Sequence, residues 1–466
     1  MAEATVTRRK DWIAAVAGYF TPRMLVILAM GFASGLPLLL TLSTLSYWLS
    51  KVGVDKTTIG LFALVGTPYT FKFLWSPIMD QVPLPVLTRL LGRRRSWLLL
   101  TQGLLAVAIF WMGTIDPTID PWMTALAAVI VAFLSASQDI VIDAYRIEIL
   151  PESEQGQGAG ATQTGYRFGL LLAGAGALAL SDHYSWTFVF GVLSAAMLAS
   201  MVVTLLAPEP QAAPRAARRD YALWVKEAVV DPFADFMGRK GWVVILLFVL
   251  FYKFGDALGG TMANPFYREM GYSGTEIAAI SKVWGVWMTV VGALIGGIAV
   301  AHWGVFRALL IGGVLQAVTN FAFAYVAIRG GDFGACAGAA WKLDEAADVA
   351  TLCSAYSHDL PALAIAITAD NIAGGAAGAA LVAYLSGLCN VAFTATQYAL
   401  LTSFMAQGRT WLSSGSGWLA DHTDWASFWS LTAFLAIPGL VLLFWIMRLY
   451  PNGAMRQPNP QGAAFD

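Results

Sequence analysis

Charged side chains stand inside segments that are otherwise apolar, and one such segment, 122–149, carries three of them on one helical face, with Glu148 near its end. Asp139, Asp143 and Arg146 follow the spacing i, i+4, i+7, which places them on one face of a helix. Two carboxylates on one face in a medium of low dielectric predict a proton site, because like charges there favour proton uptake. The alternative is an Asp143–Arg146 pair that braces a gate, and the spacing allows both interpretations.

Lysines at similar depth indicate an anionic ligand. Lys72 has no acidic residue within one turn, so its partner must come from another helix or from a ligand, and Lys282 resembles Lys72 in placement. Lys253 and Asp256 stand at i, i+3. They are either a self-neutralising pair or a site for a carboxylate-bearing substrate, since an ammonium is a compact charge with three donors.

Two arginines complete the basic set. Arg167 is expected to pair with an acid of segment 122–149 and to contribute to proton coupling or gating. Arg409 is expected near the outer end of its segment, with its guanidinium extended to the interface.

Uncharged polar groups at depth each need a hydrogen-bond partner, and they join helices as often as they bind ligands. Gln138, Asn390 and Gln397 are groups of this kind and are candidates for contacts to a ligand. Aromatic residues that could line the site are Trp75, Tyr166, Tyr252, Trp284 and Trp287.

Enzymatic chemistry is not expected. The four histidines lie far from any Ser or Cys at nucleophile spacing, and no Walker-type loop or metal-ligand spacing is present. An ion gradient is therefore the expected energy source, with no cofactor.

The elements that must position these residues are membrane helices. The 466 residues are 58% hydrophobic and 12% charged, about half the charge of a soluble domain. The net charge of -1 argues against nucleic-acid binding. With a spanning helix of about 20 residues, twelve spans are predicted at 24–48, 57–79, 96–114, 122–149, 158–181, 184–206, 241–264, 275–300, 307–328, 361–388, 393–420 and 425–447.

Basic residues predict the orientation. With a cytoplasmic N-terminus, the inside segments hold 17 basic residues and the outside segments five. Both termini are therefore expected in the cytoplasm. Segment 207–240 is predicted to be a linker with an amphipathic helix on the membrane surface.

The two halves show a weak internal repeat. After the second span come Asp80 and then the run Gly92, Arg93, Arg94 and Arg95; at and after the end of the eighth span come Gly297, Gly304 and Arg307. Both resemble degenerate forms of the cytoplasmic loop motif of the major facilitator superfamily. The predicted units are a six-helix bundle 1–206, a cytoplasmic linker 207–240, a six-helix bundle 241–448 with a periplasmic insert 329–360, and a cytoplasmic tail 449–466.

Longer stretches with a shared pattern are spread over both halves: 31–40, 59–77, 92–102, 137–144, 165–167, 252–256, 388–390 and 395–401. They resemble one branch of the superfamily, the AmpG-type muropeptide permeases of Gram-negative bacteria. The resemblance implies a proton-driven importer of anhydro-muropeptides in the inner membrane, which serves peptidoglycan recycling and feeds β-lactamase induction. The resemblance implies two kinds of partner, a small-molecule substrate and the surrounding lipid bilayer. The protein is expected to be a monomer.

Other functions remain open: transport of another bulky anion or of a drug, or a membrane sensor that binds muropeptide without moving it. The insert 329–360 has no counterpart in the family pattern. Its Cys336 and Cys353 are either bridged in the oxidising periplasm or unpaired.

Overall fold

The computed structural model describes residues 16–52, 54, 62–210, 230–331, 336 and 359–450. Within these ranges the chain is helical, without a β-strand. Nine helices of the described part are long and apolar enough to cross a membrane. They are Pro22–Leu49, Arg93–Met112, Pro121–Ile149, Trp186–Leu206, Trp242–Glu269, Ala278–Trp303, Val305–Arg329, Leu360–Leu388 and Trp425–Leu449.

Three of the twelve expected spans are not among these nine. The span expected at 57–79 is described from residue 62 as a chain of short helices, in which Pro68 and Pro77 each lie in a first turn. Proline fits there because its missing N–H is not needed. The span expected at 158–181 is rich in polar and small residues and is helical throughout, with a π-helical turn at Leu172–Gly176. The span expected at 393–420 is divided into two helices at 414–415. The count of twelve therefore stays a prediction.

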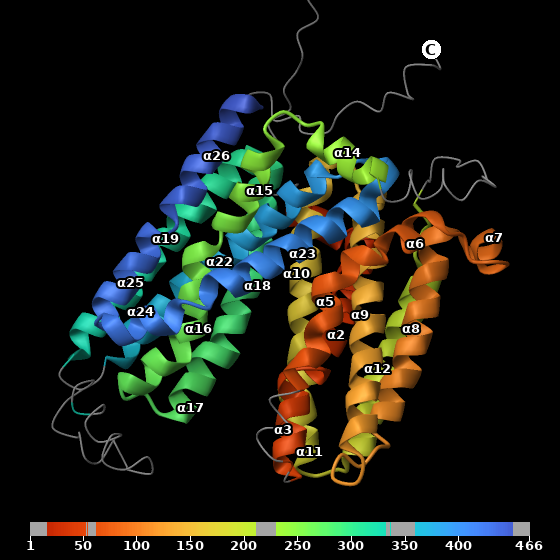
Figure 1. Cartoon of the computed structure of the whole chain (residues 1–466), viewed down its shortest axis with the longest axis horizontal. Coiled ribbons are helices and arrows are strands. Elements are labelled where there is room, and N and C mark those ends of the chain that lie inside the picture. The colour runs from red at the N-terminus through yellow and green to blue at the C-terminus, as the bar shows by residue number, and fades with distance from the viewer. Residues whose placement is uncertain are drawn as a thin grey trace, which may run out of the picture.

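Two bundles lie side by side (Figure 1). The N-terminal bundle contains α2 (Pro22–Leu40), α3 (Ser43–Lys51), η2 (Phe62–Gly66), α5 (Thr67–Phe71), η3 (Lys72–Leu74), α6 (Ser76–Gln81), α7 (Leu87–Leu91), α8 (Arg93–Met112), α9 (Pro121–Ile149), α10 (Gln155–Leu171), a π-helical turn (Leu172–Gly176), α11 (Ala177–Ser181) and α12 (Trp186–Leu206). The C-terminal bundle follows α14 (Asp231–Met237). It contains α15 (Trp242–Phe251), α16 (Phe254–Glu269), α17 (Gly274–Ile277), a π-helical stretch (Ala278–Trp284), α18 (Gly285–Trp303), α19 (Val305–Arg329), α22 (Leu360–Leu388), α23 (Thr394–Ser413), α24 (Ser416–His422), α25 (Trp425–Phe434) and α26 (Ile437–Leu449).

The bundles repeat one another helix by helix. The helix pairs α9 and α22, α10 and α23, and α12 and α25 each begin 239 residues apart, at 121 and 360, 155 and 394, and 186 and 425. Even the helix caps recur. Asp120 accepts a hydrogen bond from the N–H of Met123, and Asp359 accepts one from the N–H of Ala362. The weak sequence repeat thus reflects a repeat of whole helices.

Small residues bring helix backbones into direct contact within each bundle. A Cβ on Gly165 of α10 would collide with the carbonyl oxygen of Leu28 in α2, and one on Gly375 of α22 with that of Thr289 in α18. This is how helices pack without a hydrophobic driving force between them. The run 373–380 is accordingly a packing surface, and α10 also packs against α18 across the two bundles.

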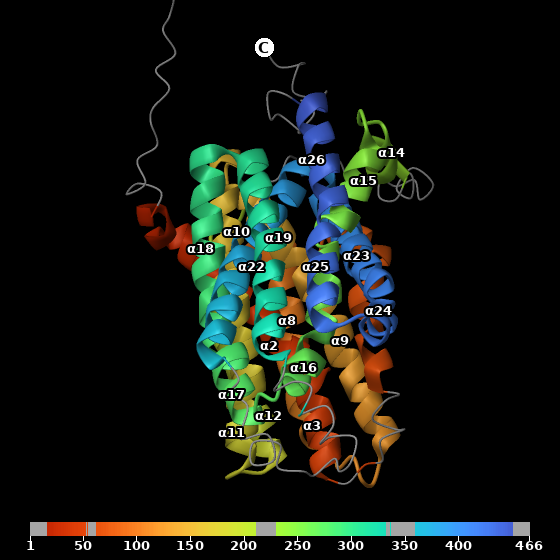
Figure 2. The same ribbon diagram turned by 90° about the vertical axis from the view of Figure 1, so that its left-hand side faces the viewer.

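The two ends of the molecule differ. We call the end with the loop 82–92, α14 and the C-terminal end of α26 the linker end, and the end with the loops 113–120, 182–185 and 423–424 the far end. Figure 2 shows α14 and α26 at one end and α3 and α11 at the other. Of the predicted amphipathic linker helix, α14 is described, while 211–229 lies outside the described residues.

Candidate functional site

The loop motif forms a buried ion network at the linker end. Arg94 is 1% exposed, and its guanidinium bonds the carboxylate of Asp80 at 2.7 Å and that of Glu148 at 2.5 Å. Arg93 donates to the Asp80 carbonyl oxygen at 2.7 Å and forms an ion pair with Glu148 at 3.3 Å. Two guanidinium groups thus face two carboxylates, and their bonds tie together α6, α8 and α9.

Gly92 and Glu209 complete the start of α8. Gly92 has φ +86°, and a Cβ there would meet the Glu209 side chain. The Glu209 carboxylate accepts the backbone N–H groups of Arg94 and Arg95 at 2.7 and 3.0 Å, the usual way to satisfy a helix N-terminus. Burial raises the pKa of Glu209 above its ordinary value, although these N–H groups and the nearby guanidinium groups oppose the rise.

The two bundles are joined at the linker end. Arg146 of α9 donates to the Ser386 hydroxyl of α22 at 2.9 Å and lies 5.4 Å from the Tyr398 ring centre of α23. It also pairs with Asp143 at 3.6 Å. Thr396 donates to the Asp80 carboxylate across the same boundary at 3.4 Å. This geometry fits the interpretation of the Asp143–Arg146 pair as a brace of the gate.

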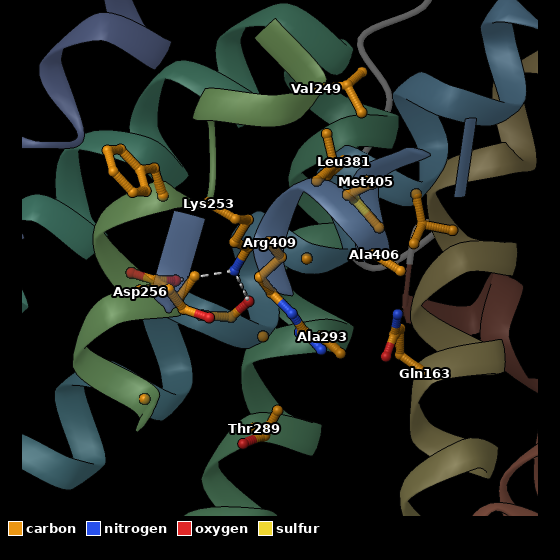
Figure 3. Close-up of a pocket in the computed structure, with 18 of the residues that line it drawn as sticks. Gln163, Val249, Lys253, Asp256, Thr289, Ala293, Leu381, Met405, Ala406 and Arg409 are labelled. Carbon is orange, nitrogen blue, oxygen red and sulfur yellow. Dashed lines mark hydrogen bonds and ion pairs between the residues drawn. The ribbon is translucent and has the colours of Figure 1, made fainter. Parts of the chain in front are cut away.

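A cavity of about 740 Å³ lies between the bundles, lined by residues of α10, α15, α16, α18, α22 and α23 (Figure 3). The break between α15 and α16 places Lys253 in its wall. Its ammonium lies 3.3 Å from the Asp256 carboxylate and donates to the Gly374 carbonyl oxygen at 3.2 Å. The Lys253–Asp256 pair is thus self-neutralised, and it also faces the cavity. Its predicted role as a site for a carboxylate-bearing substrate stays a prediction.

Arg167 and Arg409 line the same cavity. The expectation that Arg409 extends to the outer interface is wrong, because Arg409 lies midway along the α23–α24 pair and its side chain runs along the cavity toward Ala293 (Figure 3). The expected ion pair of Arg167 with an acid of α9 is not formed within the described residues. Its Nε is buried without a hydrogen-bond partner.

Asp139 and Asp143 share a cation from another helix. Lys72, 9% exposed, interacts electrostatically with both carboxylates. The Ser34 hydroxyl of α2 donates to Asp139 at 2.6 Å. The partner of Lys72 therefore comes from a neighbouring helix, and Lys72 is not among the residues that line the cavity.

Asn390 and Gln397, predicted to contact substrate, instead hold α14. Asn390 donates to the Asp235 carboxylate at 3.0 Å, and Gln397 donates to the same carboxylate at 2.7 Å and to the Pro232 carbonyl oxygen at 3.0 Å. The Gln397 oxygen accepts the N–H of Asn390 at 2.8 Å. Both side chains are thereby engaged at the linker end, away from the cavity.

Three other predicted contacts also join helices. Trp75 donates to the Ser137 hydroxyl at 3.0 Å, Gln138 to the Ala33 carbonyl oxygen at 2.8 Å, and Tyr252 to that of Leu309 at 2.8 Å. None of the three lines the cavity. The structure explains their polar groups as links between helices.

The four remaining predicted site residues, Tyr166, Lys282, Trp284 and Trp287, have different environments. The Tyr166 hydroxyl lies within electrostatic range of Asp139, Arg167 and Arg409. Lys282 is exposed and donates to Asn264 at 3.3 Å. The ring of Trp287 packs edge-on against Phe168 with centres 5.7 Å apart, and Trp284 donates to Thr368 at 2.8 Å.

Sequence reasoning did not assign Gln163, Thr289 or Asp370 to the site, although Asp370 was recognisable as an acid inside a predicted span. The first two line the cavity; Asp370 borders an adjoining space of about 100 Å³ with Asp256 and accepts from Thr319 at 3.1 Å. Asp370 carried a signal as an acid deep in an apolar segment, whereas Gln163 and Thr289 carried none.

No group of His, Cys, Asp and Glu within the described ranges is arranged to hold a metal ion. Cys336 is disulfide-bonded. Cys353 lies outside the described residues, so its pairing stays a prediction.

Comparison with known proteins defines the class. The family model of the Major Facilitator Superfamily matches residues 23–341. Among solved structures, the proton:xylose symporter XylE has a TM-score of 0.62 at 12% identity and covers 92% of this chain and 96% of that chain. FucP, solved in the outward conformation, has a TM-score of 0.62 at 10% identity, with coverage of 92% and 99%. At such identities these two show the fold alone. The chain belongs to the major facilitator superfamily.

Curated relatives narrow the class further. The anhydromuropeptide permease of Escherichia coli is 39% identical over 453 residues, 95% of this chain and 85% of the relative. A transporter named AmpG 4 of Rickettsia conorii is 33% identical over 430 residues, with coverage of 91% and 96%. Within the superfamily, the chain belongs to the AmpG-type permeases. It is a multi-pass membrane transporter of a small molecule.

Proposed function

We propose that the protein imports anhydro-muropeptides, disaccharide peptides released by wall turnover, across the bacterial inner membrane for peptidoglycan recycling. The observation that carries this proposal is the 39% identity to a permease named for that substrate over 95% of the chain. The cavity supports it. Its volume of about 740 Å³ falls within the usual range for sites that enclose a whole small molecule. In bacteria that induce β-lactamase, this import would feed the induction.

The electrostatics of the cavity also favour this cargo. Its charged lining residues are Arg167, Lys253, Asp256 and Arg409, three cations and one anion. A stem peptide carries free carboxylates that such a surface attracts, and an amine for which Asp256 is an acceptor. A disaccharide adds hydroxyl groups that polar residues such as Gln163 and Thr289 can bond.

We infer further that a proton gradient drives import, with Asp139 as the carrier and Asp143 as the runner-up. Asp143 has an ion pair with Arg146 at 3.6 Å as well as the attraction of Lys72, whereas Asp139, one turn deeper in the membrane, shares Lys72 without a second cation. A carboxylate at this depth is costly unless it is paired or protonated. Release of the proton to the cytoplasm would return the carrier to its starting state, and no cofactor is needed.

Uptake of radiolabelled anhydro-muropeptide into proteoliposomes tests the cargo. We expect accumulation inside vesicles that carry the protein, above the level of simple binding. A membrane sensor would bind the ligand without accumulating it. Retention that does not scale with internal volume would therefore contradict the proposal.

Asp139→Asn tests proton coupling, because asparagine imitates the protonated acid permanently. The variant should exchange muropeptide across the membrane without a gradient, yet lose accumulation driven by a pH gradient. Asp182→Asn is the matched control, since that acid is exposed and pairs with Lys51 at the far end. Uphill uptake by Asp139→Asn at the wild-type rate would remove Asp139 from the mechanism.

A further inference from the structure

Two guanidinium groups line the cavity without a countercharge. Within the part of the chain that the structure describes, neither Arg167 nor Arg409 forms an ion pair with a carboxylate. The Nε of Arg167 is buried and makes no hydrogen bond. Unpaired charge at bilayer depth is costly, so two such groups at one cavity indicate that an anion belongs between them.

The two arginines come from equivalent helices of the two bundles. α10 and α23 begin 239 residues apart, so the counterpart of Arg167 in α23 is Ala406, which also lines the cavity. Arg409 lies three residues further along, on the same helix face. Both guanidinium groups act electrostatically on the Tyr166 hydroxyl, which places them in one neighbourhood.

The other two charges that line the cavity are paired with each other. Lys253 pairs with Asp256, whose carboxylate also accepts a hydrogen bond from Gln316. Asp370, beyond Asp256, interacts with Lys253. In the N-terminal bundle, the carboxylates of Asp139 and Asp143 face Lys72, and Asp143 also faces Arg146. The uncompensated charge that faces the cavity is therefore that of the two arginines.

We propose that Arg167 and Arg409 together bind carboxylate groups of the cargo, one arginine from each bundle. The identity of the cargo rests on the function proposed above; the anion site rests on the geometry of the cavity. A guanidinium presents a planar fork of donors that fits a carboxylate in bidentate fashion. In this chain the carboxylates are those of the stem peptide, while the sugars occupy the rest of the cavity.

A ligand held by both arginines also connects the two bundles. The contacts between the bundles include hydrogen bonds at the linker end, the bond that the Tyr19 hydroxyl donates to the Leu294 carbonyl oxygen, and the packing of Phe168 against Trp287. A carboxylate bound by the guanidinium groups of both Arg167 and Arg409 adds a contact that draws α10 and α23 together. Binding and closure of the bundles around the cargo are then coupled through the same two side chains.

The test compares binding of an anhydro-muropeptide with that of its analogue in which every free carboxylate is converted to a carboxamide. We expect the wild type to prefer the carboxylate form, and Arg167→Gln or Arg409→Gln to weaken binding of that form by about tenfold to a hundredfold. Binding of the carboxamide form should change little in either variant. Arg448→Gln is the matched control, because Arg448 is exposed at the end of α26, outside the cavity.

If the arginine variants lose affinity equally for the carboxylate and carboxamide forms, the arginines have a structural role and the proposed site is overturned. If they lose affinity for neither form, the proposed site is also overturned. A second probe separates this result from failure of the cargo assignment. Glutarate at millimolar concentration should raise the thermal stability of the wild type and of Arg448→Gln, but not of Arg167→Gln or Arg409→Gln. Stabilisation with this pattern, without muropeptide uptake, would overturn the cargo and support the anion site. Muropeptide uptake together with equal glutarate stabilisation of all variants would support the cargo and overturn the anion site.

Discussion

At the scale of single residues, Lys72 and Lys282 have opposite environments. The Lys72 side chain is buried and attracts the carboxylates of both Asp139 and Asp143. Lys282 is exposed, and its ammonium donates to an amide oxygen of Asn264. Their similar places in the sequence give no hint of this difference, because depth along a helix does not reveal which side of the helix faces a neighbour.

Lys72→Ala should therefore impair muropeptide uptake far more than Lys282→Ala. Removal of one partner leaves buried charge uncompensated, an effect of several kcal/mol, whereas an exposed contact contributes about 1 kcal/mol or less. Initial uptake rates in proteoliposomes of equal protein content measure the difference. Equal loss in the two variants would mean that the carboxylates of α9 do not depend on Lys72.

A second residue-scale contrast separates Arg94 from Arg95. Arg94 compensates two buried carboxylates, whereas Arg95 donates to the backbone carbonyl oxygens of Thr204 and Leu205. We expect Arg94→Ala to destabilise the fold by about 3–5 kcal/mol, and Arg95→Ala by about 1 kcal/mol. Melting temperatures of the purified variants in detergent show which substitution destabilises the fold more. A wild-type melting temperature for Arg94→Ala would show that the network does not hold α6, α8 and α9 together.

At the scale of elements, α14 is fixed to the membrane bundle through one carboxylate. Burial raises the pKa of Asp235, but the donors Gln397, Asn390 and Arg239 together bring it below its ordinary value. A lowered pKa means that the carboxylate stabilises the fold above its unfolded pKa of about 3.9. This stabilisation is lost as the pH falls through the folded pKa.

Asp235→Ala should therefore lower the melting temperature at pH 7, and its difference from the wild type should shrink below about pH 4. Asp231→Ala, in the first turn of the same helix, is the control and should differ little at either pH. Gln397→Ala should behave like Asp235→Ala and leave the KM for muropeptide unchanged. A raised KM with an unchanged melting temperature would restore Gln397 to the substrate site.

The elements also show what sequence could and could not predict. Apolar runs located the nine long helices because a spanning segment needs length and hydropathy alone. The roles of Asn390, Gln397 and Gln138 were not predictable, because a polar group at depth looks the same whether it bonds a helix, a linker or a ligand. Arg409 was misplaced by a depth estimate, since the α23–α24 pair continues past it to His422.

At the scale of the whole molecule, the two bundles meet around one cavity and are joined at the linker end. The repeat, the basic loop and the charged face of α9 could all be found in the sequence. The meeting of α10 and α23 at the cavity could not, because it depends on how two bundles pack, and no local pattern records that. Transport by alternating access requires these contacts to break at one end while others form at the opposite end.

The measurement that tests this account most directly is the distance between spin labels on the two bundles, with and without muropeptide. One pair replaces Ile119 and Asp421 at the far end, and the control pair replaces Leu90 and Arg307 at the linker end; all four side chains are exposed. We predict that muropeptide shortens the far-end distance in the wild type, and that Arg167→Gln reduces this response. Distances at both ends that stay constant at saturating muropeptide would contradict closure of the bundles around cargo in this cavity.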